Sequence, residues 1–515
     1  MKTIQRSDWS RDRAAHLLNR AGFGCTPEQA DAAAKRDPAE LVDELVSFDT
    51  ARPPAPPEWV KPGVEEREKY REMAGLTPEE RMMRQREIRR ENIERLSQLR
   101  VWWLERMRTG AAPLQERLTL FLHGHFATGM TKVRNAYAMY EQNRMFRAKA
   151  NGNWEDIVLA VSRDPAMIIY LDNAQNRKGR PNENYARELM ELFTLGEGHY
   201  TEKDIQESAR AFSGWGLHRD RMEFLFQPRQ HDNDRKVFFE KAGNLNGEDI
   251  VRFILERPRA VEYLARKLWA FFAYTEPEDE VVSDLAAVLR ASRMELKPAL
   301  RAMFLSPAFH SARAVRTQIK SPVQWLVGAI LHLGAPRIPP FLSQMMLRSL
   351  GQELFDPPSV KGWDGGPSWI TASNLLNRYN FAGILAKGAR AIPPNLVGQF
   401  AGGGPGKPDK PGKPGKDDAA MDMEREKFRK RVAAGAARLP ALLSAPDVLP
   451  AAFRADPDQA VARLFDRLFQ SPLRDKDRLA FREHLKDMPP VSKWTATEVQ
   501  DAAHHLMSTP QYQLT

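Results

Sequence analysis

The chain has one cysteine, Cys25, among its 515 residues. A single thiol cannot form an intramolecular disulfide, and it cannot supply a metal site that needs two thiolates. The sequence also lacks any uncharged apolar run of about 18 residues, which is the length that a membrane-spanning helix requires. We therefore expect a soluble globular protein without a membrane span, stabilised by the packing of its side chains.

The features of a secretory signal are missing as well. Residues 1–9 lead directly into charged, helix-patterned sequence, without the apolar core and small-residue cleavage site of a signal peptide. On this basis we expect a cytoplasmic protein.

Positive charge exceeds negative charge, and the formal net charge is +10. Such a protein attracts polyanions, among them nucleic acids, acidic polysaccharides and lipid headgroups. Between Lys61 and Arg108, however, the basic residues alternate with glutamates, which is typical of a solvated helix with i, i+4 ion pairs. No zinc finger or aromatic RNA-binding motif accompanies the charge. We interpret the excess as a solvated surface and expect no nucleic-acid partner.

Helix signals recur along the chain. Three threonines are followed, three residues later, by a side chain that can complete a helix cap, and they predict helix starts at Thr26, Thr77 and Thr201. After Thr77, apolar residues at helical spacing predict one core-facing stripe: Ile93, Leu96, Leu99, Trp103 and Met107. Further helices are predicted over residues 131–149, 153–172, 247–273, 278–305, 317–334 and 371–389.

Strand signals are few. We predict that residues 222–226 and 236–240 pair as one hairpin across a polar loop. Residues 396–418 are rich in glycine, proline and lysine, which predicts a disordered linker. The predicted fold is mainly α: a large irregular multi-helical domain over residues 1–395 with one small β-hairpin, the linker, and a small helical C-terminal unit over residues 419–515.

The segment most suggestive of function is residues 182–196, which we interpret as a helix beginning at Asn182 and ending at Gly196. Polar side chains at helical spacing share one side of it: Asn184, Glu188 and Glu191, with Glu183 and Arg187 nearly in line. Carboxylates and an arginine on one stripe suit a metal ion, acid–base catalysis, or a ladder of ion pairs. Spacing alone favours the ladder.

Three histidines are candidate metal ligands. His123 and His125 flank Gly124 at the end of an apolar helix. In an extended segment they would share a face and could chelate one ion, whereas in a continuous helix they would diverge by about 200°. His231 directly precedes Asp232 in the loop of the predicted hairpin. Adjacent histidine and aspartate residues are common both in ligand-binding loops and in ordinary turns.

Other sites of chemistry have weaker support. Trp363 lies in an aromatic loop that suits stacking on a sugar or base, although such loops more often plug a helical core. The sequence contains no phosphate-binding glycine loop, no Gly-x-Ser-x-Gly nucleophile motif and no His-Glu-x-x-His zinc motif.

Taken together, an ordered set of motifs resembles the bacterial family catalogued as domain of unknown function 1800. The matching pieces are residues 16–24, 121–126, 164–167, 170–173, 182–196, 209–215, 226 with 231–232, 267–269, 306–309, 357–359 and 362–363. They span roughly residues 12–385. The chain departs from the family pattern at Leu122, where an aromatic residue is usual, and at Phe193, where a histidine is frequent.

The resemblance implies which residues belong to the shared pattern: His123, His125, Asn182, Glu183, Asn184, Arg187, Glu188, Glu191, His231 and Asp232. From it we predict a polar pocket with three groups of residues: catalytic Glu188, Glu191, Arg187 and Asp232; substrate-binding Asn182, Asn184 and Trp363; and metal-binding His123, His125, His231 and Glu188. These ligands suit a divalent zinc, manganese or iron ion. The predicted chemistry is metal-assisted hydrolysis or oxidation.

The alternative is a non-catalytic binding or scaffold protein. Arg187 would then bridge Glu183 and Glu191 within a buried polar network. Proteins of the resembled family commonly occur alongside proteins catalogued as domain of unknown function 1501, which resemble sulfatases. The resemblance thus implies a sulfatase-like partner, and export in its company is the alternative to a cytoplasmic location. The sequence alone does not decide whether the protein is an enzyme.

Overall fold

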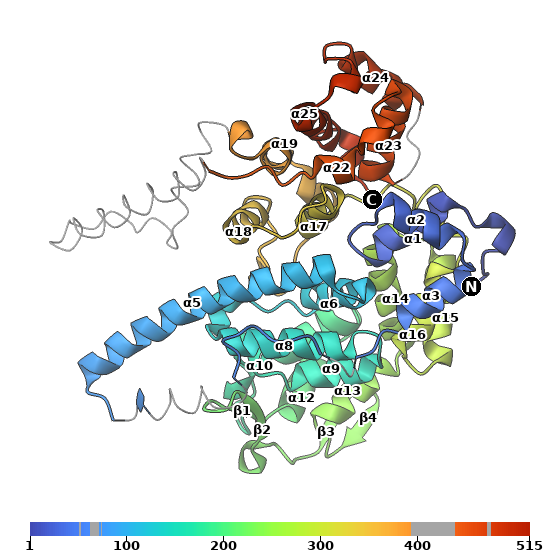
Figure 1. The fold of residues 1–515 in the computed structure, drawn as a ribbon. Helices are drawn as coiled ribbons and strands as arrows, with labels where there is room; N and C mark the ends of the chain where they lie inside the picture. The colour runs from blue at the N-terminus through green and yellow to red at the C-terminus, as the bar shows by residue number, and fades with distance from the viewer. Residues whose placement is uncertain (51–52, 62–71, 74, 393–437, 471–474) are drawn as a thin grey trace. The chain divides into compact units, whose positions relative to one another are not determined.

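The computed structural model describes residues 1–50, 53–61, 72–73, 75–392, 438–470 and 475–515. Helices dominate this part of the chain and confirm the mainly α fold class (Figure 1). The chain forms two compact units, each built from segments that are distant in sequence. Unit 1 comprises Met1–Gly22, Ala34–Gln318 and Glu353–Asp364, and unit 2 comprises Phe23–Ala33, Ile319–Gln352 and Gly365–Thr515.

The predicted domain boundary stays a prediction. The predicted linker, residues 396–418, lies outside the described residues, as does residue 419, where the C-terminal unit was predicted to begin. The described C-terminal residues belong to unit 2 together with residues 319–352. Backbone hydrogen bonds join them to the rest of that unit: the Leu442 N–H donates to the Leu385 carbonyl, and the Ser444 N–H donates to the Leu333 carbonyl, both at 2.9 Å.

Unit 1 contains most of the helices in the described part of the chain. Their bounds are α1 Arg11–Ala21, α3 Pro38–Val46, α5 Pro78–Thr109, α6 Pro113–His125, α7 Met130–Val133, α8 Ala136–Lys149, α9 Trp154–Ser162, α10 Pro165–Tyr170, α11 Asn184–Glu188, α12 Glu202–Ala211, α13 Gly247–Leu255, α14 Pro258–Phe272, α15 Asp279–Ala291 and α16 Leu296–Phe304. A π-helix, η3, follows α11 directly over Leu189–Thr194.

The helices of unit 2 come from both ends of the chain. Their bounds are α2 Pro27–Ala34, α17 Pro322–His332, α18 Pro340–Ser349, α19 Ala372–Lys387, α22 Ala445–Val448, α23 Pro457–Phe469, α24 Asp475–Leu485 and α25 Ala496–Met507. One apolar side of α23 is buried, as its spacing indicates: Leu464, Phe465, Leu468 and Phe469.

Local signals for helix starts are confirmed. Thr26, Thr77 and Thr201 each accept a hydrogen bond from the backbone N–H three residues on, and the side chain there accepts one in return. Prolines divide two of the longer predicted helices. The predicted helix over 153–172 breaks before Pro165, and the one over 247–273 breaks before Pro258, because proline fits the first turn of a helix and not its interior.

The predicted pairing of residues 222–226 with 236–240 is wrong. Two separate antiparallel hairpins are present instead: β1 Trp215–His218 pairs with β2 Glu223–Phe226, and β3 Lys236–Phe238 pairs with β4 Lys241–Gly243. Each strand pairs with its nearest neighbour in sequence, across a short turn. A short loop costs less entropy to close than the loop that the predicted pairing requires.

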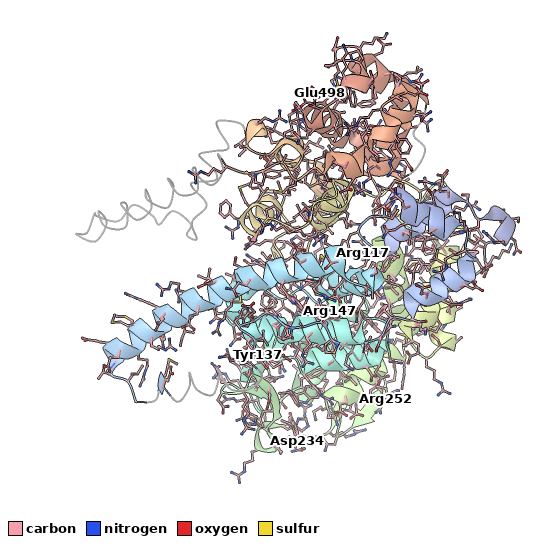
Figure 2. The ribbon with its side chains drawn as sticks, in the orientation of Figure 1. Arg117, Tyr137, Arg147, Asp234, Arg252 and Glu498 are labelled. Carbon is pink, nitrogen blue, oxygen red and sulfur yellow. The ribbon has the colours of Figure 1, made fainter. Side chains whose placement is uncertain are left out.

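The core of unit 1 contains a buried ion pair as well as apolar side chains. Glu116 of α6 accepts hydrogen bonds from Arg147 Nε and Nη2 of α8, both at 2.8 Å, and from Trp103 Nε1 at 2.9 Å. Figure 2 shows Arg147 among the helices of this unit. Four of the five apolar residues predicted along α5 are also buried, but Ile93 is 46% exposed. None of the helices in the described ranges is both long and apolar enough to cross a membrane.

Candidate functional site

The predicted helix over residues 182–196 has two parts with different geometry. Asn182 caps its start, since its Oδ1 accepts the Asn184 N–H at 3.0 Å, and α11 follows over Asn184–Glu188. From Leu189 the backbone continues as the π-helix η3. A π-helix has more residues in each turn than an α-helix, so the side chains after Glu188 do not follow the expected i, i+3, i+4 spacing.

This change of geometry breaks the predicted ion-pair ladder. Arg187 donates to Glu183 at 3.3 Å, as predicted, but its other carboxylate partner is Glu202 of α12 at 2.8 Å. Glu191 instead accepts a hydrogen bond from the Tyr200 hydroxyl at 2.9 Å. Arg187 therefore connects α11 to α12 and does not bridge Glu183 and Glu191.

The C-terminal end of η3 is capped by side chains from α6 and α14. The Tyr263 hydroxyl donates to the Leu192 carbonyl at 2.6 Å, and Arg259 Nε donates to the Leu195 carbonyl at 3.0 Å. Between them, His125 Nε2 lies 2.9 Å from the Phe193 carbonyl oxygen. These groups satisfy carbonyls that have no partner within the helix.

His125 serves this cap as a neutral imidazole. Its Nε2 must carry the proton in order to donate to the Phe193 carbonyl. The ring is surrounded by aromatic side chains, including Phe121 and Trp154. Burial lowers the pKa of His125 to about 3, and the nearby charge of Lys267 contributes to the decrease.

His123 is neutral as well but points to a different neighbourhood. Its Nε2 accepts a hydrogen bond from the Phe355 N–H at 3.0 Å, so the proton is on Nδ1. Its ring contacts Trp103, Phe355 and Trp363, with the Trp363 centroid 5.6 Å away. Burial lowers the pKa of His123 to about 3, and Arg100 adds to the effect.

The two histidines are separated because α6 runs without interruption to His125. Of the two geometries that the sequence leaves open, this is the continuous helix, in which neighbouring imidazoles diverge. His123 packs on residues 355–363, and His125 packs on η3. The structure therefore does not place these two imidazoles around one ion.

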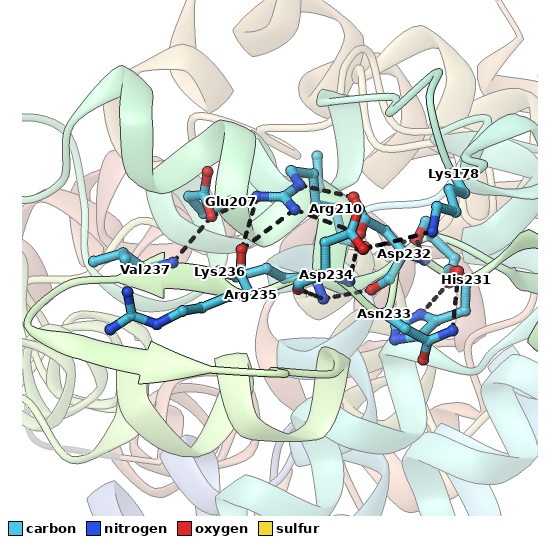
Figure 3. Close-up of polar contacts among 12 residues, drawn as sticks. Lys178, Glu207, Arg210, His231, Asp232, Asn233, Asp234, Arg235, Lys236 and Val237 are labelled. Atoms are coloured by element: carbon cyan, nitrogen blue, oxygen red, sulfur yellow. Dashed lines mark hydrogen bonds and ion pairs between the residues drawn. The ribbon is translucent and has the colours of Figure 1, made fainter.

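His231 and Asp232 belong to a third neighbourhood, beside the two hairpins (Figure 3). His231 Nδ1 donates to the Ser213 carbonyl at 2.8 Å. Asp232 pairs with Arg210 of α12 at 2.8 Å. Although burial opposes it, the Arg210 hydrogen bonds hold the pKa of Asp232 below its ordinary value.

The same network includes a buried lysine. Lys236 is fully buried, and its Nζ donates to the backbone carbonyls of Asp232 and Asp234. Burial lowers the pKa of Lys236. Glu207 of α12 accepts the Val237 N–H at 3.0 Å and pairs with Arg210 at 2.9 Å. These contacts hold the loop and β3 against α12, so Asp232 has a structural partner for its charge.

The structure thus does not gather the four predicted metal ligands, His123, His125, His231 and Glu188. In the described part of the chain, no three histidine, cysteine or carboxylate side chains lie close enough together to hold a metal ion. Each of the three histidines instead contacts a backbone amide or carbonyl.

Glu188 stands apart from the other predicted site residues. Its side chain is half-buried, and within the described ranges it has neither a hydrogen bond nor an ion pair. Burial raises the pKa of the Glu188 carboxyl, and the negative charge of Glu191 raises it further. A carboxyl without a partner in a partly buried position is costly to keep ionised.

Tyr170, at the end of α10, lies near enough to Glu188 for the charge of that carboxyl to affect its hydroxyl. Its hydroxyl likewise has no hydrogen-bond partner in the described part of the chain. Burial raises the pKa of Tyr170, and the charges of Asp356 and Glu188 contribute. Asp356 is held by Thr131, whose Oγ1 donates at 2.6 Å. We call Glu188, Tyr170 and Asp356 the Glu188 site.

Gly129 lies where Tyr170 and Asp356 meet. A Cβ atom there would lie 3.2 Å from the Tyr170 ring and 3.5 Å from Asp356 Oδ1, so a side chain would crowd both groups. Two neighbouring residues have the left-handed backbone conformation that residues other than glycine rarely adopt: Asp172, with φ of 57°, and Phe355, with φ of 63°. Unusual backbone conformations and π-helices are both frequent at functional sites.

The buried amide of Asn176, which the sequence did not single out, helps to fix the position of α11. Asn176 Oδ1 accepts the Asn182 N–H at 3.1 Å, and Asn182 Nδ2 donates to the Asp172 carbonyl at 3.1 Å. Asn176 Nδ2 also donates to the Ala209 carbonyl of α12 at 2.8 Å. Asn182 therefore acts as a structural cap. Asn184 is exposed at the first turn of α11, and Trp363 is half-buried against His123.

A comparison of the whole sequence with family models identifies the family of this chain. The profile described as "Protein of unknown function (DUF1800)" matches residues 16–514. The chain belongs to the DUF1800 family. No curated protein and no solved structure matches the chain.

The DUF1800 match extends well beyond residue 385, where the recognised motifs end, and includes the described residues 438–515. Both compact units are therefore part of what the family shares. Two members of the Glu188 site, Tyr170 and Asp356, were missed as site residues. Tyr170 lies inside one of the recognised motifs, and Asp356 immediately precedes another, so both carried a signal at the level of the family pattern.

Proposed function

We propose that this DUF1800 protein is an enzyme that uses Glu188 as a general acid. The observation that supports the proposal is a half-buried carboxyl with a raised pKa and no partner in the described part of the chain, whose charge affects a tyrosine hydroxyl that also lacks a partner. A carboxyl whose pKa is raised toward neutrality holds a proton that it can give to a leaving group.

The surrounding charges indicate the kind of substrate. Glu188, Glu191 and Asp356 place several carboxyl groups around the site. The nearby Lys132 is already paired with Asp172 at 2.7 Å, and Arg187 is paired with Glu183 and Glu202. This balance disfavours an anion and favours a neutral or cationic substrate.

The proposed reaction is hydrolysis. Glu188 donates a proton to the departing oxygen or nitrogen as the scissile bond breaks. A water molecule supplies the incoming hydroxyl, and its remaining proton returns to the Glu188 carboxylate. The Tyr170 hydroxyl donates a hydrogen bond that orients the substrate. This route requires one protonated carboxyl and does not need a cluster of metal ligands. The position of Glu188 therefore favours it over the metal-assisted chemistry predicted from the sequence.

The test compares the wild-type chain with Glu188→Gln on neutral ethyl esters, methyl glycosides and aminoacyl 4-nitroanilides, whose leaving groups need a proton to depart. We expect turnover of at least one of these classes and a decrease in kcat of about 10²- to 10⁴-fold in the variant. Because the proton donor must be protonated, kcat/KM should fall as pH rises through the Glu188 pKa. That limb should be absent from the pH profile of the residual activity of Glu188→Gln.

Glu183→Gln is the matched control, because Glu183 lies five residues earlier in the same segment and has a cationic partner. It should stay within a few-fold of wild type. Turnover that is equal in both variants, or no turnover of any substrate class, would contradict the proposal. Elemental analysis provides a second arm: stoichiometric metal in the wild type that is lost in Glu188→Gln would favour the metal-binding prediction instead.

A scaffold function is the second candidate. It is favoured by the structural contacts of Arg187, Asp232, His123, His125 and His231. Size-exclusion chromatography of the full chain mixed with a sulfatase-like protein of the domain of unknown function 1501 family tests it. A stable complex that forms equally well with Glu188→Gln, together with no turnover, would support the scaffold.

A further inference from the structure

The N-terminal part of α5 has an exposed side that the core does not use. Figure 1 shows this part of the helix extending past the other helices of unit 1. Three large apolar side chains there are exposed: Met82 is 49% exposed, Met83 is 69% exposed and Ile93 is 46% exposed. Exposed apolar residues that cluster on one element mark interaction surfaces more often than isolated ones do.

Arginines lie between these apolar residues on the same side of the helix. At 100° per residue, Met82, Arg86, Arg89 and Ile93 fall within an arc of about 60°, and Arg90 and Met83 lie beside it. Arg86, Arg89 and Arg90 are exposed, and within the described ranges they have neither hydrogen bonds nor ion pairs. We call these six residues the α5 stripe.

The charges on the other side of α5 are arranged differently. Arg84 pairs with Glu87 at 2.8 Å, with Glu91 at 3.2 Å and with Glu72 at 3.0 Å. Glu87 and Glu91 of the helix thus pair with Arg84, while the arginines of the stripe have no such partner within the described ranges. The expected ion pairs along this basic segment are present at Arg84, whereas Arg86, Arg89 and Arg90 are exposed to solvent without such pairs in the described ranges.

We propose that the α5 stripe binds an anionic lipid surface. Its arginines would contact headgroup phosphates, while Met82, Met83 and Ile93 reach the boundary of the acyl chains. This is peripheral binding by one side of a helix, in which electrostatic attraction and a small apolar area act together. It is independent of the Glu188 site.

The order of residues favours a lipid surface over a protein partner. Cores of protein interfaces are depleted of charge, with apolar side chains at the centre and polar ones at the rim. In the α5 stripe the arginines occupy the middle, and the apolar residues lie at the two ends. A membrane supplies phosphate groups at every position along such a stripe, whereas a protein needs a matching set of carboxylates.

The test measures co-sedimentation of the full-length protein with vesicles of equal parts phosphatidylglycerol and phosphatidylcholine. Each arginine near an anionic surface contributes about fivefold in affinity, so the triple variant Arg86→Gln, Arg89→Gln, Arg90→Gln should bind about a hundredfold more weakly. Met82→Ser with Ile93→Ser should also weaken binding, and that loss should persist at high salt, because only the electrostatic part is screened.

The matched control removes the same charge elsewhere in unit 1. Arg177, Arg219 and Arg229 are exposed and likewise have no side-chain partner in the described part of the chain, and their triple glutamine variant should bind as wild type does. Equal loss in both triple variants would reduce the effect to net charge and overturn the proposal. Binding to soluble polyglutamate without binding to the vesicles would also overturn the proposal, because it would indicate an acidic protein partner. Circular dichroism of each variant checks that it is folded.

Discussion

Replacement of Asp164 by asparagine should change how the stability of the protein depends on pH. Asp164 caps the start of α10, and its Oδ2 accepts hydrogen bonds from the Met167 N–H and Gln142 Nε2, both at 2.8 Å. The side chain is buried. Burial raises the pKa of Asp164 from its ordinary value of 3.8 to about 7, although these hydrogen bonds oppose the increase.

The sign of the effect follows from which state holds the proton. Between about pH 4 and pH 7 the folded protein keeps the Asp164 proton and the unfolded chain has lost it, so this group contributes less stability as pH rises. A difference of about 3 pKa units corresponds to at most about 4 kcal/mol at 1.36 kcal/mol per unit. The contribution is fully present below pH about 4 and is lost once pH has passed about 7.

Asparagine cannot titrate, but its Oδ1 can accept the same two hydrogen bonds. The free energy of unfolding of Asp164→Asn, minus that of the wild type, should therefore increase by up to about 4 kcal/mol between pH 4 and pH 8. Buried histidines such as His123, His125 and His310 have lowered pKa values and oppose this trend in the wild type. They are present in both proteins, so their contribution cancels in the difference.

Urea unfolding followed by tryptophan fluorescence, repeated across this pH range, measures the difference. Asp156→Asn on α9 is the control, because it removes a carboxyl of the same type from an exposed position. If the difference for Asp164→Asn stayed constant within about 1 kcal/mol, Asp164 would not keep its proton on folding and the reasoning would be refuted.

Two other substitutions test the packing of unit 1. Glu116→Gln leaves Arg147 buried without its carboxylate and should lower the free energy of unfolding in urea by about 3–5 kcal/mol. The control Glu141→Gln, at a surface ion pair, should lower it by less than about 1 kcal/mol. Similar losses in the two variants would contradict the role of the buried pair. Gly214→Ala should destabilise the fold by more than about 1 kcal/mol and so lower the melting temperature. Gly214 has φ of 78°, and a Cβ there would lie 2.7 Å from the Gln227 carbonyl oxygen. An unchanged melting temperature would argue against that backbone constraint.

The Glu188 site shows why the candidate residues could be identified only in part. Glu188 was singled out from its helical spacing and its family motif. Its neighbours, Tyr170 and Asp356, come from other parts of the sequence, and no periodicity connects them to α11. The π-helix after Glu188 also lies beyond spacing arguments, because the pattern of apolar residues at 189–194 fits an α-helix equally well.

The three-dimensional surroundings of the histidines could not be predicted from the sequence either. Their residue type suits a metal, and the sequence left open whether α6 continues through Gly124. Because the helix does continue, His123 receives the Phe355 N–H and His125 caps η3. Each imidazole satisfies a backbone group that burial would otherwise leave without a partner. That role depends on neighbours about 70 to 230 residues away in the chain.

The sequence by itself determined the features that depend on neighbouring residues: the mainly α class, the capping boxes at Thr26, Thr77 and Thr201, and the buried side of α23. These are set by hydrogen bonds and apolar spacing within a few residues. Tertiary structure decided which strands pair, and which basic residues of α5 and which carboxyl of α11 lack partners in the described part of the chain. Each of these depends on what packs against a side chain, and the packing partners are brought together only by the folded chain.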